Sequence, residues 1–172
     1  MSTVIVFGGS GFLGRQLVDR LTADGMTVGV AVRHPDSARH ALRALESDRV
    51  AFVKADVRDA SSVTEVVAGA DAVVNTVSAY VEKGGVTFEG VHVEGAKTVA
   101  REAAAAGIAR LVLVSGIGAD PASASRYIRT RGRGETLVRD AFSGATIARP
   151  GSLLGPGMRC FAPCRSLQVF CR

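Results

Sequence analysis

The stretch Val4–Gly14, with the sequence VIVFGGSGFLG, decides the fold of this chain. Its first part, Val4–Phe7, is a run of large apolar residues without the alternation of a half-exposed strand, so it predicts a strand buried on both faces. Closely spaced glycines follow, and from Phe12 onward apolar residues recur at helical spacing. The stretch therefore predicts a strand, a glycine turn and a helix in direct succession.

The glycines of this turn have the spacing that a dinucleotide requires. A diphosphate rests on a helix N-terminus only where no side chain stands between it and the backbone. Gly8 and Gly9 permit a tight turn and Gly11 permits close approach of the phosphates, whereas Gly14 permits close packing of the helix on the strand. Two spacings fit, G-x-G-x-x-G from Gly9 and G-x-x-G-x-x-G from Gly8. The residues predicted to bind the cofactor here are Gly8, Gly9, Ser10, Gly11, Phe12, Leu13 and Gly14.

Length and charge predict one globular domain that binds no nucleic acid. The 172 residues suffice for a single core, and no run of eighteen apolar residues predicts a transmembrane segment. Without a basic leader or cleavage-site pattern, we expect a cytoplasmic protein. The net charge is +5, but residues 158–172 contain three arginines and no acid, so the remaining chain carries only +2. Dispersed basic residues of this kind argue against a nucleic-acid partner.

The cysteines and histidines predict no metal site. Cys160, Cys164 and Cys171 all lie near the C-terminus, and their spacing lacks a fourth ligand. A body without cysteine is compatible with a reducing cytoplasm. We expect capping or surface roles for the three histidines, because none has an evident catalytic or metal-binding partner in the sequence. These histidines are His34, His40 and His92.

Strand and helix patterns alternate along the chain. The predicted strands are residues 4–7, 27–32, 50–54, 72–76, 110–115 and 146–149. The predicted helices begin at residue 12, at Asp36 or Ser37 (through residue 45), at Ser61 or Ser62 (through residue 68), at residue 87 (through 106) and at residue 126 (through 142). Right-handed crossovers between such strands give a parallel sheet with helices on both faces. We predict a doubly wound Rossmann sheet in a three-layer α/β/α arrangement.

In this architecture the ligand lies at the carboxyl ends of the strands, where the winding reverses. Arg33 follows the second strand, where an acid would bind the ribose of NAD; a guanidinium instead suits a 2′-phosphate, so NADP(H) is favoured over NAD(H). Asp56 fits a place where the adenine amine is bound, with Val57 packed on the ring, although Asp56 as a plain turn residue is the alternative. The further residues predicted at this edge are Thr76, Val77 and Pro150.

These motifs resemble the extended and atypical short-chain dehydrogenase/reductase superfamily, which includes NAD-dependent epimerases and dehydratases. The resemblance covers residues 3 to about 157 and rests on Gly8-x-x-Gly11-x-x-Gly14, Asp56-Val57, residues 91–96, 113–115, Tyr127, 149–151 and 155–157. Within the superfamily, residues 116–120 and 125–131 look most like the nucleotide-binding accessory subunit of respiratory complex I and its bacterial relatives. That resemblance implies a nucleotide held as a structural element, with a respiratory complex or a second copy of the chain as partner.

In active members of the superfamily, a Ser, a Tyr and a Lys four residues after the Tyr perform the proton transfer. Ser115 and Tyr127 match, but Arg131 stands where the lysine is expected. Arginine keeps the positive charge and cannot release a proton. Three hypotheses remain: an accessory nucleotide binder, an oxidoreductase or epimerase using Tyr127 and Ser115 on a carbonyl or hydroxyl substrate, and a dinucleotide sensor. The plain alternative is that Ser115 only ends a strand and Tyr127 only anchors a helix.

Members of the superfamily continue past this point into a smaller carboxyl-terminal portion that supplies substrate contacts. We therefore expect residues 1–157 to form the NAD(P)-binding domain, with the substrate portion absent. Residues 158–172 are expected to be an out-of-frame or truncated ending, or to be disordered if genuine. The sequence does not predict the substrate.

Overall fold

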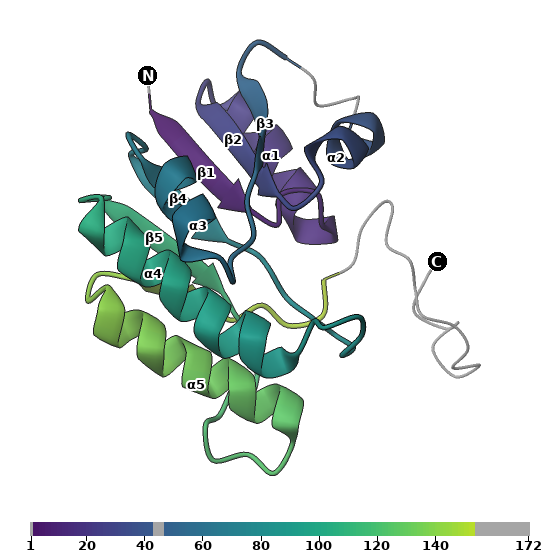
Figure 1. Ribbon diagram of the computed structural model, residues 1–172, viewed down its shortest axis with the longest axis vertical. Helices are drawn as coiled ribbons and strands as arrows, with labels where there is room; N and C mark the ends of the chain where they lie inside the picture. Colours follow the sequence, from purple (N-terminus) through teal and green to yellow (C-terminus); the bar gives the residue numbers. More distant parts are fainter. Residues whose placement is uncertain (1, 43–46, 154–172) are drawn as a thin grey trace.

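A computed structural model describes residues 2–42 and 47–153 of the chain (Figure 1). The strands are β1 (Thr3–Phe7), β2 (Thr27–Val32), β3 (Val50–Lys54), β4 (Ala72–Asn75), β5 (Arg110–Val114) and β6 (Thr146–Ala148). The helices are α1 (Phe12–Ala23), α2 (Pro35–Ala41), α3 (Ala60–Val67), the π-helix η2 (Glu89–Gly95), α4 (Ala96–Ala105) and α5 (Arg126–Ala141). Every predicted strand is present, with ends that differ by at most one residue.

The strands form one parallel sheet in the order β3-β2-β1-β4-β5-β6. The chain winds outward from β1 in one direction and then, from β4 onward, in the other. The predicted doubly wound Rossmann sheet is therefore confirmed. Because the winding reverses between β1 and β4, the carboxyl ends of these two strands diverge into loops that leave room for a ligand.

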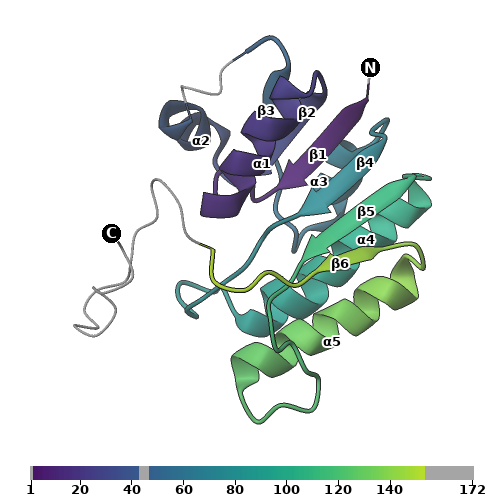
Figure 2. The same cartoon turned by 180° about the vertical axis from the view of Figure 1, so that it is seen from behind.

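Alternate residues of β1 serve two separate cores. Val4 and Val6 pack with Val18 of α1, whereas Ile5 and Phe7 belong to the core beneath α3, α4 and α5. All four β1 side chains are nearly inaccessible, and burial of each contributes about 1.5–3 kcal/mol to stability. The sheet thus lies between α1 and α2 on one face and α3, α4 and α5 on the other. In Figure 2 no helix of the described residues lies in front of β5 and β6.

The single helix predicted from residue 87 to 106 is two elements. The π-helix η2 precedes α4, and it is wider than an α-helix because its hydrogen bonds span five residues. Val91, His92 and Val93 are all buried within it. A Cβ on Gly95 would lie 2.8 Å from Val57 Cγ2, so this turn packs directly against the end of β3. The predicted surface role of His92 is therefore wrong, because the wide turn places its ring inside.

Helix α5 is continuous despite the glycines that lower its helical propensity. A Cβ on Gly134 would lie 1.8 Å from the carbonyl oxygen of His92, and one on Gly132 would lie 2.3 Å from the backbone nitrogen of Pro121. Both glycines therefore allow α5 to approach η2 and the preceding loop more closely than any other residue would. Their place in the sequence reflects packing and not an interruption of the helix.

Two helix starts differ from the predicted ones. Helix α2 begins at Pro35, with His34 at the cap position, because proline is preorganised for the first turn of a helix. Helix α3 begins at Ala60, and the carboxylate of Asp59 caps it by accepting from the Ser61 amide at 3.1 Å.

The predicted end of α2 at residue 45, the cysteines and the C-terminal ending from residue 154 lie outside the described residues. In residues 2–42 and 47–153, none of the helices combines the length and the apolar character needed to cross a membrane. Over the same ranges, no three His, Cys, Asp or Glu side chains come together as a set of metal ligands.

Candidate functional site

The glycine turn closes tightly between β1 and α1. Gly8 has φ +76°, a conformation that favours glycine, and its carbonyl accepts from the Gly11 amide at 2.9 Å. A Cβ on Gly14 would lie 2.3 Å from the Gly8 oxygen, so α1 begins in direct contact with the turn. No side chain caps α1, and its first turn contains no acid. The amides at its start are therefore available to an anion.

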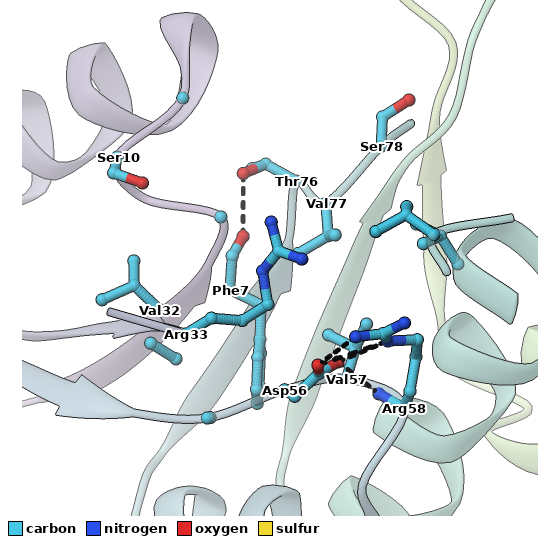
Figure 3. A pocket seen from close by; sticks show the side chains of 16 residues that line it. Phe7, Ser10, Val32, Arg33, Asp56, Val57, Arg58, Thr76, Val77 and Ser78 are labelled. Atoms are coloured by element: carbon cyan, nitrogen blue, oxygen red, sulfur yellow. Dashed lines mark hydrogen bonds and ion pairs between the residues drawn. The ribbon is translucent and has the colours of Figure 1, made fainter. Parts of the chain in front are cut away.

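A cavity of about 260 Å³ lies at the carboxyl edge of the sheet, beside this turn (Figure 3). It occupies the point where the winding reverses, between the ends of β1 and β4. Its lining comprises Phe7, Gly8, Ser10, Gly11, Ala31, Val32, Arg33, Ala55, Asp56, Val57, Arg58, Thr76, Val77, Ser78, Val86 and Val91.

Eight of the residues predicted to bind the cofactor line this cavity. They are Gly8, Ser10, Gly11, Arg33, Asp56, Val57, Thr76 and Val77. Two others act by packing: Gly14 touches the turn, and a Cβ on Gly9 would lie 2.9 Å from Val30 Cγ1. Phe12 and Leu13 form the first turn of α1, and the Pro150 carbonyl accepts from the Ile117 amide at 3.1 Å. These last residues support the site without lining the cavity.

Arg58 also lines the cavity, although it is not among the residues predicted to bind the cofactor. Its Nε donates to both oxygens of the Asp56 carboxylate, at 3.0 and 3.2 Å, and its Nη2 donates at 2.7 Å (Figure 3). Hydrogen bonds from Arg58 lower the pKa of Asp56, which is therefore ionised near neutral pH. Arg58 Nη1 also donates to the Gly85 carbonyl at 3.2 Å. An adenine amine at Asp56 would share this carboxylate with Arg58. The spacing Asp-x-Arg in the sequence could have indicated that Arg58 pairs with Asp56.

Arg33 extends over the cavity from the end of β2 (Figure 3). It is exposed, and its charge contributes to the lowered pKa of Asp56. A second, shallower hollow of about 530 Å³ adjoins the cavity, and Arg33, His34, Lys54 and Arg58 are among its lining residues. The same lining contains the acids Asp56, Asp59 and Glu65, so the cations and anions of this hollow balance.

Tyr127 and Arg131, predicted as catalytic candidates, lie together beyond Ser78. The Arg131 guanidinium is 5.0 Å from the centroid of the Tyr127 ring, and its Nη2 donates to Ser78 Oγ at 2.5 Å. Arg131 is only 8% exposed. Because Ser78 lines the cavity, this pair stands at the cavity's end nearest β4 and α5.

Ser115, the third catalytic candidate, is buried at the end of β5, near Glu135. Burial is the largest influence on the Glu135 carboxyl and raises its pKa, but the hydrogen bonds from Arg149, the nearby Ser115 hydroxyl and the charges of Arg149 and Arg139 together lower it below its usual value. No described residue completes a hydrogen bond to Ser115 Oγ with full geometry. The structure therefore joins Tyr127 to Arg131 and makes no hydrogen bond between Ser115 and Tyr127.

His92 lies at the centre of a buried hydrogen-bond chain. Its Nε2 accepts from the Ala79 amide at 3.2 Å, which leaves the proton on Nδ1, 3.1 Å from Thr130 Oγ1. Thr130 in turn donates to the Tyr127 carbonyl at 3.1 Å. Burial, and then the charge of Arg131, lower the pKa of His92 to about 4. The ring is therefore neutral at pH 7 and holds the start of α5 against η2.

This pKa predicts a pH dependence of stability. The unfolded histidine binds a proton near its ordinary pKa of 6.5 and the folded one only near 4, so acidification between these values favours unfolding. We expect a loss of about 3 kcal/mol in the free energy of unfolding across this interval, complete below about pH 4. In His92→Gln, which retains a donor and an acceptor, most of this dependence should disappear when denaturation is measured at several pH values.

His40→Gln is the matched control for this measurement, because it makes the same substitution at an exposed position on α2. The Glu135 carboxyl, with its lowered pKa, adds its own loss of stability only below about pH 4.5. An unchanged slope in His92→Gln would contradict the assignment of a buried neutral ring.

Comparison with known proteins identifies the family. A family model described as NAD(P)H-binding matches residues 8–157, which include the glycine turn and every residue that lines the cavity except Phe7. The chain belongs to the NAD(P)H-binding family. The predicted membership of a family that binds NAD(P)H is thereby confirmed.

The relatives include subunits of a respiratory enzyme. The mitochondrial 40 kDa subunit of NADH-ubiquinone oxidoreductase from Neurospora crassa is 35% identical over 89% of this chain and 41% of that protein. Subunit 9 of the NADH dehydrogenase 1 alpha subcomplex from Arabidopsis thaliana is 36% identical over 92% of this chain and 40% of that protein. A ceramide reductase from Caulobacter vibrioides is 35% identical over 90% and 47%, respectively. The chain thus spans less than half the length of these curated relatives.

Solved structures share the fold. The Bordetella bronchiseptica enzyme WbmH, in complex with NAD⁺, superposes with a TM-score of 0.74 at 20% identity, covering 91% of this chain and 57% of that one. A double mutant of DesIV, a dTDP-glucose 4,6-dehydratase from Streptomyces venezuelae with bound NAD, has a TM-score of 0.69 at 24% identity, covering 85% and 54%. At this identity the likeness establishes the Rossmann architecture alone.

Proposed function

We propose that the chain holds a nicotinamide dinucleotide, NADP(H) in preference to NAD(H), as a structural element of a larger assembly. The diphosphate would rest on the amides of Gly8–Gly14, with the adenine between Asp56 and Val57. A respiratory complex is the proposed assembly, because two of the relatives reported above are subunits of NADH-ubiquinone oxidoreductase or NADH dehydrogenase.

One observation carries the structural role, namely the geometry of Arg131. A proton relay through Tyr127 needs a neighbour that lowers the tyrosine pKa and passes a proton onward. Arg131 supplies charge but no proton, and its Nη2 is engaged by Ser78. No hydrogen bond joins Ser115 to the tyrosine, and Ser115 Oγ has no hydrogen-bond partner among the described residues. Both features support a bound dinucleotide that is not turned over.

The test compares the binding of NADPH with its oxidation. We expect the purified chain to bind NADPH saturably, as measured by calorimetry, while NADPH absorbance stays constant in the presence of carbonyl substrates. Sustained oxidation of NADPH that depends on Tyr127 would contradict a purely structural role.

Preference for NADP(H) is supported by Arg33, which lines both hollows. In Arg33→Asp, we expect NADPH binding to weaken roughly thirtyfold more than NADH binding, because about 2 kcal/mol of charge-assisted hydrogen bonding to the 2′-phosphate is lost. Calorimetric titrations of both nucleotides measure the two losses. Arg39→Asp, an exposed charge reversal on α2 outside both hollows, is the matched control. Equal losses for NADPH and NADH in Arg33→Asp would refute the preference.

An oxidoreductase is the second candidate, and the contact between Arg131 and Tyr127 favours it. A guanidinium 5.0 Å from the ring centroid stabilises a tyrosinate, which could exchange a proton with a carbonyl or hydroxyl substrate. The ceramide reductase among the relatives supports this alternative. Under this hypothesis, Tyr127→Phe loses at least a hundredfold in turnover with unchanged dinucleotide binding.

A further inference from the structure

Arg131 is a buried cation without an acidic partner. It is 8% exposed, and a guanidinium keeps its charge inside proteins. Its hydrogen bonding is limited to the donation from Nη2 to Ser78 Oγ, and Nε is enclosed without a partner. In the part of the chain that the structure describes, no carboxylate forms an ion pair with it. A buried charge that lacks a charged partner is unfavourable, so an anionic partner would stabilise it.

The other buried ionised side chain of α5 is fully compensated. Glu135, one turn further on, is 1% exposed, and Arg149 Nε donates to both of its carboxylate oxygens, at 2.9 and 3.1 Å. Arg139 lies 3.8 Å from the same carboxylate. Burial of an ion is costly unless it is paired, and the fold pairs Glu135 but leaves Arg131 with a hydroxyl and an aromatic ring.

The charged groups near Arg131 do not neutralise it. His92 is uncharged near pH 7, since its pKa is about 4. Glu82, the nearby acid, accepts from Arg126 Nη1 at 2.7 Å and from the Phe88 amide at 2.8 Å. The potential at the Arg131 head is therefore positive.

One edge of the Arg131 guanidinium is open to a ligand. A Cβ on Gly116 would lie 3.4 Å from Arg131 Nη1, so a larger residue at this position would cover that nitrogen. Nη1 makes no hydrogen bond with the described residues and is not enclosed by them. Ser78, which flanks the head on the other side, lines the dinucleotide cavity. The open edge thus adjoins the cavity at the ends of β4 and β5.

Large apolar side chains follow both residues that flank this head. Ile117, next to Gly116, is 72% exposed. Tyr80 and Val81, which follow Ser78 closely in the chain, are 73% and 66% exposed. Of these, the Tyr80 ring stacks on that of Tyr127, which Arg131 contacts, at a centroid distance of 6.1 Å. An exposed apolar side chain near a cationic head suits a ligand with an anionic group and an apolar body.

We propose that Arg131 and Ser78 form a binding site for a small carboxylate with an aryl or acyl body, beside the nicotinamide end of the dinucleotide. The carboxylate accepts from Arg131 Nη1, while Ser78 Oγ, which accepts from Nη2 and lies 3.4 Å from His92 Nε2, holds the guanidinium in place. The dinucleotide cannot itself supply this anion, because its phosphates belong at the glycine turn and its nicotinamide carries no negative charge. The placement relative to the nicotinamide rests on the proposed function.

Benzoate tests this site in the full chain, with and without NADPH. In calorimetric titrations at constant ionic strength, we expect benzoate to bind at least tenfold more tightly than its neutral isostere benzamide, and more tightly than acetate, which lacks the ring. In amide NMR spectra, benzoate should shift the signals of Ser78, Gly116 and Ile117. Equal binding of benzamide, or shifts confined to Gly8–Gly14, would overturn the proposal.

Two substitutions test whether the charge of Arg131 is what binds benzoate. Arg131→Gln should weaken benzoate binding at least tenfold, and Arg131→Lys should retain most of it. If Arg131→Gln does not fold, the comparison of benzoate with benzamide on the unmodified chain decides. A chain that binds NADPH but not benzoate would overturn the carboxylate site alone. A chain that binds neither NADPH nor NADH would overturn the proposed function instead.

Discussion

Replacing Gly11 with valine is expected to weaken dinucleotide binding at least a hundredfold while the fold remains intact. Gly11 has φ −72°, which any residue adopts, and a Cβ there would contact only the Gly8 oxygen, at 3.2 Å. The added side chain would project where α1 presents its uncapped amides, and it would exclude the diphosphate by about 3 kcal/mol. Calorimetric titration with NADPH measures the loss, and circular dichroism reports the fold.

Gly144→Val is the matched control for this experiment. Gly144 lies in the connection between α5 and β6, and a Cβ there makes only ordinary contact, at 3.6 Å from Phe142 Cε1. We expect its NADPH binding to equal that of the unmodified chain. If Gly11→Val bound NADPH as tightly as Gly144→Val does, the diphosphate could not lie on the glycine turn.

Gly134→Ala is expected to lower the free energy of unfolding by about 3 kcal/mol or more. Helix propensity alone predicts the opposite sign, since alanine stabilises a helix by about 1 kcal/mol relative to glycine. The packing decides, because the new Cβ would lie 1.8 Å from the His92 carbonyl oxygen, and neither backbone can yield locally. Denaturant unfolding of the variant and the unmodified chain measures the difference.

Gly134→Ala alters the contact between α5 and η2, which lies away from the glycine turn. Helix α5 and η2 carry Tyr127, Arg131 and His92, whereas the glycine turn lies at the start of α1. Gly144→Ala again serves as the control, with an expected effect within about 0.5 kcal/mol. If the Gly134→Ala chain were as stable as the unmodified chain, α5 and η2 would have to lie further apart than they do in the structure.

The local signals in the sequence were sufficient for the sheet. Each strand is a short apolar run bounded by turn residues, so residues such as Val4–Phe7 specify a buried strand without knowledge of their neighbours. The glycine turn was equally predictable, because its geometry depends on backbone space within a few residues. The parallel order then followed from the alternation of strands and helices.

Features that depend on distant contacts were not predictable in the same way. The π-helix η2 arises where residues 89–95 pack against α5 and against Val57, in the loop after β3, and alanine-rich composition gives no sign of it. Gly132 and Gly134 lower the helical propensity of α5, and the surfaces that explain them are more than ten residues away in the chain. Likewise, no motif in the sequence indicates that Ser115 lies near Glu135, one turn beyond Arg131.

One titration tests the central claim most directly, namely that a nicotinamide dinucleotide occupies the glycine turn and the cavity beside it. NADPH and NADH are each added to the folded full chain in a calorimeter, and the melting temperature is followed in parallel. The account predicts a single saturable site for both nucleotides, with NADPH the tighter ligand and each raising the melting temperature. A folded chain that gives neither heat nor a melting shift with either nucleotide would contradict it.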